Sequence, residues 1–204
     1  MTPDTEWVTA MATIEPSTRR GFPSSAQAFT VDDLLELPDD GNRYELFNGS
    51  LLVSPAPTPL HQLIITNALL MLQHVMPPPL VALTTVNVRV SDKDFYIPDL
   101  VVVREDVARN VELMFSPTDI LLAAEVVSPS TKMRDELFKV EAYAKAGIPT
   151  YWRIDPAEGP TLHVHQLNGK RYDDPAVFKP GEPADLTAPF PLTFDPADLL
   201  RARR

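Results

Sequence analysis

A single glutamate interrupts an apolar run, Ile120 to Val127, that has the length and composition of a buried strand. An ionised carboxylate inside such a strand costs several kcal/mol unless it is paired or bound to a metal ion. Glu125 must therefore lie beside a cation. The cation can be a structural Lys or Arg partner, or it can be a metal ion.

A second acid, Asp99, lies at the mouth of another apolar run that ends at Val103 and begins with Ile97 and Pro98. If the strands that carry Asp99 and Glu125 are neighbours, both carboxylates can reach one point near the strand ends. Pro98-Asp99 taken alone is typical of a turn. Taken together, the two acids predict a site for Mg²⁺ or Mn²⁺, because hard cations prefer oxygen ligands.

The segment after Glu125 predicts a helix from about residue 132 to 146, ended by Gly147. At about 100° per residue, Lys139 and Tyr143 fall on one flank of its apolar stripe. From there the Lys139 ammonium can extend toward the two carboxylates, although a solvated surface lysine is the alternative. Asp135 lies one turn earlier and can pair with Lys139.

Composition limits the function classes. The 204 residues contain no cysteine, so disulfides, thiol nucleophiles and cysteine-ligated metals are excluded. The formal charge of −10 argues against avid nonspecific binding to nucleic acid, but a divalent ion or a local basic rim can supply the attraction. A Gly-x-Ser-x-Gly elbow, which would indicate a catalytic triad, is absent. The chain also lacks an apolar stretch of membrane-spanning length and a secretory pattern, so we expect a cytoplasmic protein without a membrane partner.

The order of elements predicts a mixed sheet with helices on its faces, an α/β fold of the α+β type. We expect helices near residues 30–38, 58–76 and 132–146, and hairpins at 43–53 and 162–172 whose turns are Asn48-Gly49 and Asn168-Gly169. Further strands are expected at 80–90, 96–103, 119–127 and 150–155. Residues 104–117 are expected to cover a sheet edge. Three regions are predicted: a flexible tail (1–27), one domain (28–198) and a basic tail (199–204).

An ordered set of motifs resembles the PD-(D/E)XK nuclease superfamily, which has the fold of restriction endonucleases, and most closely its Uma-type branch. The resemblance covers roughly residues 29 to 195. It is carried by Arg43-Tyr-Glu-Leu46 with Asn48-Gly49, Pro98-Asp99, Glu125-Val-Val-Ser-Pro-Ser-Thr131, Asp135, Lys139, Tyr143, and Gly147 to Trp152 with Asp155-Pro156. It implies a restriction-endonuclease-like core, flanking helices and an N-terminal hairpin.

The resemblance also implies roles for single residues. Asp99 and Glu125 would hold the metal, with Glu45 as the additional acid, although Glu45 can equally pair across the hairpin or with Arg43. The superfamily lysine two residues after the acid is missing, because position 127 is valine. Lys139 would replace it, as in members whose lysine has moved to the following helix. His61, at the start of a helix, is a further candidate for the site or for helix capping.

Three other features have plainer interpretations. His163 and His165 share one strand face and could bind a metal, but without a third ligand we interpret them as surface residues. Tyr151 and Trp152 are interpreted as sheet packing rather than as a platform for bases. The terminal arginines, from Arg201 on, are interpreted as a frayed tail.

Two function hypotheses follow. The first is a Mg²⁺- or Mn²⁺-dependent endonuclease that hydrolyses DNA and forms a homodimer, because two sites most simply cut two strands. The second is a non-catalytic module with a nuclease fold that serves interaction or regulation. The acidic charge and the absent local lysine motivate the second hypothesis.

Overall fold

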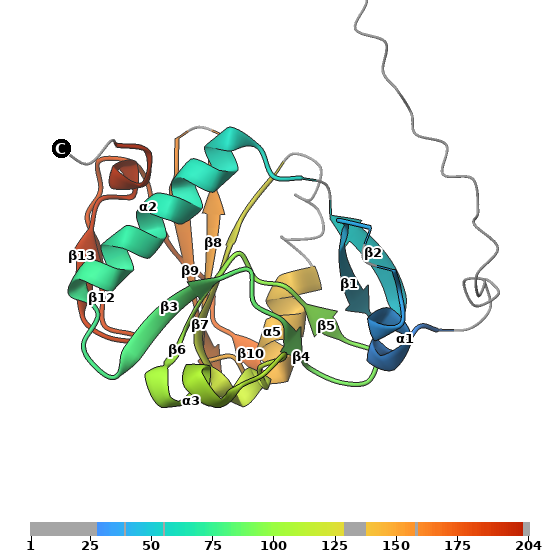
Figure 1. Ribbon diagram of the computed structural model, residues 1–204. Helices are drawn as coiled ribbons and strands as arrows, with labels where there is room; N and C mark the ends of the chain where they lie inside the picture. Colours follow the sequence, from blue (N-terminus) through green and yellow to red (C-terminus); the bar gives the residue numbers. More distant parts are fainter. Residues whose placement is uncertain (1–27, 39, 55, 129–137, 158, 202–204) are drawn as a thin grey trace, which may run out of the picture.

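The computed structural model describes residues 28–38, 40–54, 56–128, 138–157 and 159–201 (Figure 1). The predicted tail at 1–27 and most of the predicted first half of the helix at 132–146 lie outside these ranges. In chain order the elements are α1 (Val31–Leu35), β1 (Arg43–Phe47), β2 (Ser50–Ser54), α2 (Pro59–Val75), β3 (Leu80–Thr84), β4 (Val88–Arg89), β5 (Phe95–Tyr96), β6 (Leu100–Arg104), α3 (Glu105–Asn110), the 3₁₀ helix η1 (Pro117–Asp119), β7 (Ile120–Val126), α5 (Val140–Ala146), β8 (Thr150–Asp155), β9 (Thr161–Asn168), β10 (Arg171–Tyr172), β11 (Ala176–Phe178), β12 (Ala184–Leu186), β13 (Leu192–Phe194) and the 3₁₀ helix η3 (Pro196–Leu200).

The main sheet is mixed, with the order β10-β9-β8-β7-β6-β3 and β11 paired to β9. β6 pairs antiparallel with β7, in a register that sets Leu100 opposite Ala124. β7 pairs in parallel with β8, and α5 lies between these two strands in the chain. Because β6 and β7 are neighbours, Asp99 and Glu125 come to the same end of the pair, as the sequence predicts.

Two predicted strands are each divided between two sheets. The expected strand at 80–90 splits into β3 and β4, with Thr85 at φ 59 in the break. The expected strand at 96–103 splits into β5 and β6, and Pro98 lies in that break. β4 and β5 instead join β1 and β2 in a four-stranded sheet with the order β2-β1-β5-β4. This smaller sheet lies beside the main sheet, with α1 next to it (Figure 1).

The two predicted hairpins form, one with a shifted turn. Phe47 pairs with Ser50, so Asn48 and Gly49 make the two-residue turn at φ 47 and φ 75. These positive angles are the reason for the Asn-Gly pair. In the second hairpin Asn168 pairs with Arg171, so the turn residues are 169 and 170 rather than the predicted Asn168-Gly169.

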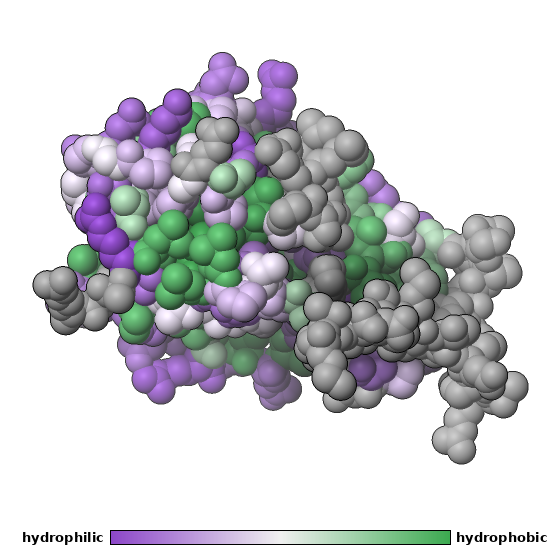
Figure 2. Space-filling model, turned by 90° about the horizontal axis from the view of Figure 1, so that it is seen from above, coloured by the Kyte–Doolittle hydropathy of each residue, from purple (hydrophilic) through white to green (hydrophobic). Residues whose placement is uncertain are grey.

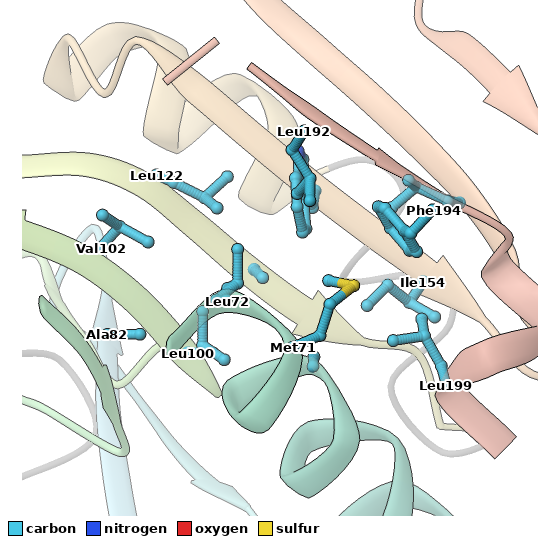
Figure 3. Packing of buried hydrophobic residues seen from close by; sticks show 14 of the residues in the cluster. Met71, Leu72, Ala82, Leu100, Val102, Leu122, Ile154, Leu192, Phe194 and Leu199 are labelled. Carbon is cyan, nitrogen blue, oxygen red and sulfur yellow. The ribbon is translucent and has the colours of Figure 1, made fainter. Parts of the chain in front are cut away.

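Strand alternation separates two apolar cores on the faces of the main sheet. One face packs against α2, β12, β13 and η3, and Figure 3 shows Met71 and Leu72 of α2 meeting side chains of β6, β7, β8 and β13. Trp152 belongs to this core, as predicted. The other face packs against α5 and contains Val101, Ala123, Tyr143 and Tyr151. Glu125 lies two residues after Ala123 in β7 and so points to the same face, where it contacts Lys139 and Tyr143.

The smaller sheet has a separate core of Val31, Leu46, Phe95 and Ile97. α1 has Thr30 as its N-cap, whose hydroxyl accepts from the Asp33 amide while the Asp33 carboxylate accepts from the Thr30 amide. The helix ends at Leu35, slightly before the predicted position near Pro38.

α2 runs diagonally across the upper left of the molecule in Figure 1 and buries Ile64, Ala68 and Leu72 in the core. Its predicted span of 58–76 is confirmed, with Thr58 as N-cap and Pro59 in the first turn. The view from above shows apolar surface (green) near the middle of this face, bordered by polar side chains (Figure 2). No helix among the described residues has both the length and the apolar character to cross a bilayer.

The packed region extends past the predicted boundary at residue 198. η3 runs to Leu200, and Leu199 is buried in the core against α2. Arg201, the last described residue, pairs with Asp198.

Candidate active site

Five elements bring ionisable side chains to one end of the β6–β7 pair. Glu45 comes from the middle of β1, Asp99 precedes β6, Glu125 is the penultimate residue of β7, and Lys139 directly precedes α5. All four are 7 % exposed or less. The fifth element is the first turn of α2, which brings His61. The structure thus brings together the residues that the sequence predicts for the site, and they lie between the two sheets.

Glu125 is held by two groups from the α5 side. The Lys139 ammonium lies 2.6 Å from Glu125 Oε1, and the Tyr143 hydroxyl donates to the same oxygen at 2.7 Å. Lys139 and Tyr143 are four residues apart and so lie on one flank of the chain as it enters α5. The charge in the apolar strand is therefore paired, and its partner is the predicted lysine.

Glu45 joins the smaller sheet to this pair. Its Oε1 lies 3.4 Å from the Lys139 ammonium and accepts from the Ile97 amide at 3.0 Å. Lys139 therefore contacts two carboxylates, one on each sheet. The alternative in which Lys139 is a solvated surface residue is wrong, because its side chain is 6 % exposed.

Asp99 accepts two hydrogen bonds at one oxygen, Oδ2. The Val126 amide donates at 2.9 Å, and His61 Nε2 lies at 3.1 Å. In the first contact the Asp99 carboxylate accepts from a backbone amide that a strand carbonyl would otherwise bind. Asp99 therefore ends the backbone pairing between β6 and β7. The second contact places His61 in the site; its backbone amide also donates to the N-cap Thr58.

The environment fixes the protonation state of Asp99. Burial opposes the ionised carboxylate, but the hydrogen bond from His61, the charges of His61 and Lys139 and the Val126 amide outweigh it and lower the pKa of Asp99. Burial and the charges of Glu125 and Glu45 raise the pKa of Tyr143 well above its ordinary value. Tyr143 therefore stays a neutral donor to Glu125.

Arg43, which the sequence offered as a possible partner of Glu45, contacts the backbone beside the site. Arg43 Nη2 donates to the Ile97 carbonyl at 3.0 Å, on the same loop whose amide holds Glu45. Its position two residues before Glu45 in β1, hence on the same face, is the signal that could have identified it. The predicted partner role of Asp135 lies outside the described residues.

The charge of these side chains suits a divalent cation. The three carboxylates face one ammonium, which leaves a formal charge of −2 when His61 is neutral. Uncompensated charge of this size is costly in a buried site. The donors are oxygens without thiolates, which is the set that Mg²⁺ and Mn²⁺ prefer. As the side chains stand, no three His, Asp or Glu residues of the described part are arranged to hold an ion.

The mixed sheet with carboxylates and a lysine at one end of neighbouring strands defines a protein with a restriction-endonuclease-like fold. The crystal structure of a putative nuclease belonging to DUF820 from Anabaena variabilis ATCC 29413 has a similar fold. Its TM-score is 0.66 at 22% sequence identity, over 84% of this chain and 97% of that chain. The chain belongs to the Uma2 family, described as a putative restriction endonuclease family, whose model matches residues 31–200. None of the curated proteins compared with the chain matches it.

Proposed function

We propose that the protein is a divalent-metal-dependent endonuclease that hydrolyses phosphodiester bonds in DNA. One observation carries the proposal: three buried carboxylates lie near a single buried ammonium, which pairs with two of them, one from each sheet. Such a site can take up a cation and a phosphate, the two charges that this chemistry brings together. The Uma2 family membership supports the same reaction class.

Asp99, Glu125 and Glu45 are the residues that would hold Mg²⁺ or Mn²⁺. The bound ion would polarise the phosphodiester and lower the pKa of an attacking water. Lys139, released in part from the two glutamates, would donate to the phosphate oxygens or to the water and stabilise developing charge. Tyr143 would keep hold of Glu125, and His61 would orient Asp99. The contacts of each side chain support these roles.

A plasmid assay tests the proposal. Purified protein is incubated with supercoiled plasmid and Mg²⁺ or Mn²⁺, and nicked and linear products are followed in time. We expect Glu125→Gln to lower the rate at least a hundredfold, because it removes a charged ligand while keeping nearly the same shape. The matched control is Glu141→Gln, the same substitution at an exposed position of α5 that pairs only with Lys145 among the contacts seen.

Equal plasmid cleavage by the wild type and by Glu125→Gln would contradict the assignment. EDTA serves as a further control, since chelation is expected to abolish cleavage by the wild type. Fresh Mn²⁺ added after chelation should restore it.

A second candidate function is a non-catalytic module. It is supported by the hydrogen bonds and ion pairs that the acids already make within the protein. Glu125 is engaged by Lys139 and Tyr143, and Asp99 by Val126 and His61. Calorimetric titration with Mn²⁺ separates the two functions. Saturable binding that is lost in Glu125→Gln supports the enzyme, and no heat at millimolar Mn²⁺ supports the module.

The homodimer also stays a prediction. β2 is an outer strand of the smaller sheet, and outer strands offer unpaired backbone groups to a second copy. Light scattering coupled to size-exclusion chromatography measures the mass directly. A monomer mass at micromolar concentration would contradict the dimer.

A further inference from the structure

An exposed aromatic ring lies next to the candidate active site. Phe138 directly precedes Lys139, yet it is 50% exposed whereas Lys139 is buried. The exposed part of a Phe ring gains nothing from burial, but isolated exposed apolar side chains are common on protein surfaces. Phe138 is different because its neighbours fix it relative to the acids.

The ring is positioned through β1. Phe138 meets Phe47 edge to face, with ring centroids 5.6 Å apart at 67°. Glu45, which contacts Lys139, and Phe47 are two residues apart on β1 and so share one face of that strand. Two residues of a strand span roughly 7 Å, so the ammonium and the ring contact neighbouring positions on the same face of β1.

A line of aromatic contacts ties the ring to the carboxylates. Phe47 packs on Tyr96 at 5.4 Å, and Tyr96 packs on Tyr143 at 5.6 Å. The Tyr143 hydroxyl in turn donates to Glu125. Phe138 is the solvent-exposed end of this line. Phe138 is half exposed beside its edge-to-face contact with Phe47, and this exposed part of the ring is the surface offered to a flat partner.

We propose that Phe138 stacks on an unpaired base adjacent to the phosphodiester held at Lys139, and that the substrate is single-stranded or locally unpaired DNA. The proposal rests on the proposed nuclease function. In a duplex the faces of the bases are covered by their neighbours, so only an unpaired base can lie on the ring. Stacking also suits a chain with a formal charge of −10, which gains little from general attraction to phosphates.

Binding is measured with the full chain and an oligonucleotide that carries one 2-aminopurine, either single-stranded or annealed to its complement, in Ca²⁺. We expect tighter binding of the single strand and quenching of the 2-aminopurine. Phe138→Ala is expected to weaken single-strand binding about tenfold and duplex binding less than twofold. Phe138→Trp should retain binding, and its own emission should be quenched by the single strand. Leu113→Ala, at another exposed apolar residue, is the control and should change neither affinity.

Each outcome separates this inference from the proposed function. Equal losses on both oligonucleotides, no loss in Phe138→Ala, or unquenched Phe138→Trp emission would overturn the stacking role. If neither the plasmid nor the single-stranded oligonucleotide is cleaved in Mn²⁺ but Phe138→Ala still loses single-strand binding, the nuclease proposal fails and the stacking role stands. If the plasmid is cleaved and Phe138→Ala binds like the wild type, the stacking role fails and the nuclease proposal stands.

Discussion

At the scale of single residues, Lys139 is the cation that links carboxylates of the two sheets. It is a buried lysine that contacts Glu125 on the main sheet and Glu45 on the smaller one. Removing one partner of a buried ion pair leaves the other charge buried and unpaired. The resulting loss of folding free energy exceeds the net stabilisation that the pair itself provides. The same ammonium therefore supports both the folded state and the proposed chemistry.

Replacing Lys139 with Met should destabilise the protein by about 3 kcal/mol, because Glu45 and Glu125 then face each other without the cation. Chemical denaturation measures the loss. Lys145→Met, at an exposed residue paired with Glu141, is the control and should change stability by no more than about 0.5 kcal/mol. The double variant Lys139→Met with Glu125→Gln should recover part of the loss. A Lys139→Met protein as stable as the wild type would show that the pair contributes nothing.

His165 gives a pH prediction. The interpretation of His165 as a surface residue is wrong: it is 6% exposed, stacks on Tyr151 at 5.5 Å, and neither ring nitrogen has a hydrogen-bond partner among the described residues. Burial, with the charges of Arg153 and His163, lowers its pKa to about 4. The unfolded chain, with an ordinary pKa near 6.5, takes up a proton first as the pH falls. Stability is therefore full above about pH 6.5 and decreases toward pH 4.

The expected loss from this one group is roughly 2 kcal/mol between pH 7.5 and 4.5. It is measured by urea denaturation of the wild type and of His165→Phe, which keeps the stacking but cannot be protonated. The Phe variant should show the smaller pH dependence. The exposed His74, replaced with Gln, is the control and should behave like the wild type. Parallel pH profiles for wild type and His165→Phe would contradict the prediction.

The sequence pointed to Glu125, Asp99 and Lys139 through local patterns, whereas Glu45 was implied by the family resemblance alone. Glu125 interrupts an apolar strand, and Lys139 borders an apolar stripe. The partners of these side chains were harder to predict. The contacts of Asp99 with His61 and of Arg43 with the Ile97 carbonyl join segments 38 and 54 residues apart, and no local pattern encodes such distances. The burial of His165 likewise depends on Tyr172, from the next strand.

At the scale of elements, packing rather than propensity decides which strands belong together. Apolar alternation predicted a strand at 80–90, but it could not show that the strand breaks at Thr85 and enters two sheets. α2 was predicted closely because its caps and its apolar period agree along the whole helix. Its inner face then fixes how the helix lies on the main sheet (Figure 3).

Two leucines of α2 test this packing. Leu72 is fully buried, and Leu70, two residues earlier, is 43% exposed. Leu72→Ala should destabilise the fold by about 3 kcal/mol through lost burial and the cavity left behind. Leu70→Ala, the same substitution in the same helix, should stay within about 0.5 kcal/mol of the wild type. Urea midpoints measure both variants, and equal losses would show that α2 does not pack by this face.

At the scale of the whole molecule, the candidate ligands bridge two sheets. Glu45 lies on the smaller sheet, while Asp99 and Glu125 lie at the end of the main one. An ion bound by all three would hold the two sheets together as well as serve the chemistry. Binding to the folded state alone stabilises it by mass action.

Mn²⁺ at about a hundred times its dissociation constant should therefore add about 2.7 kcal/mol of stability, which corresponds to roughly 5–10 °C in Tm. Thermal unfolding followed by circular dichroism, with and without the ion, measures the shift. Asp99→Asn, which keeps an oxygen acceptor for the Val126 amide, should remove most of the shift without unfolding the protein. An equal shift in Asp99→Asn would contradict a role for Asp99 in binding the ion.

The contact between Glu45 and Lys139 joins residues that lie 94 positions apart in the chain. During synthesis the hairpin that carries Glu45 leaves the ribosome long before the lysine does. Asp99 and Glu125 also emerge before Lys139 and Tyr143. A nascent chain that stops before residue 139 therefore has all three acids but neither the ammonium nor the phenol that hold Glu125. We therefore expect an incomplete chain of this kind to be inactive, because the proposed chemistry needs α5 folded against both sheets.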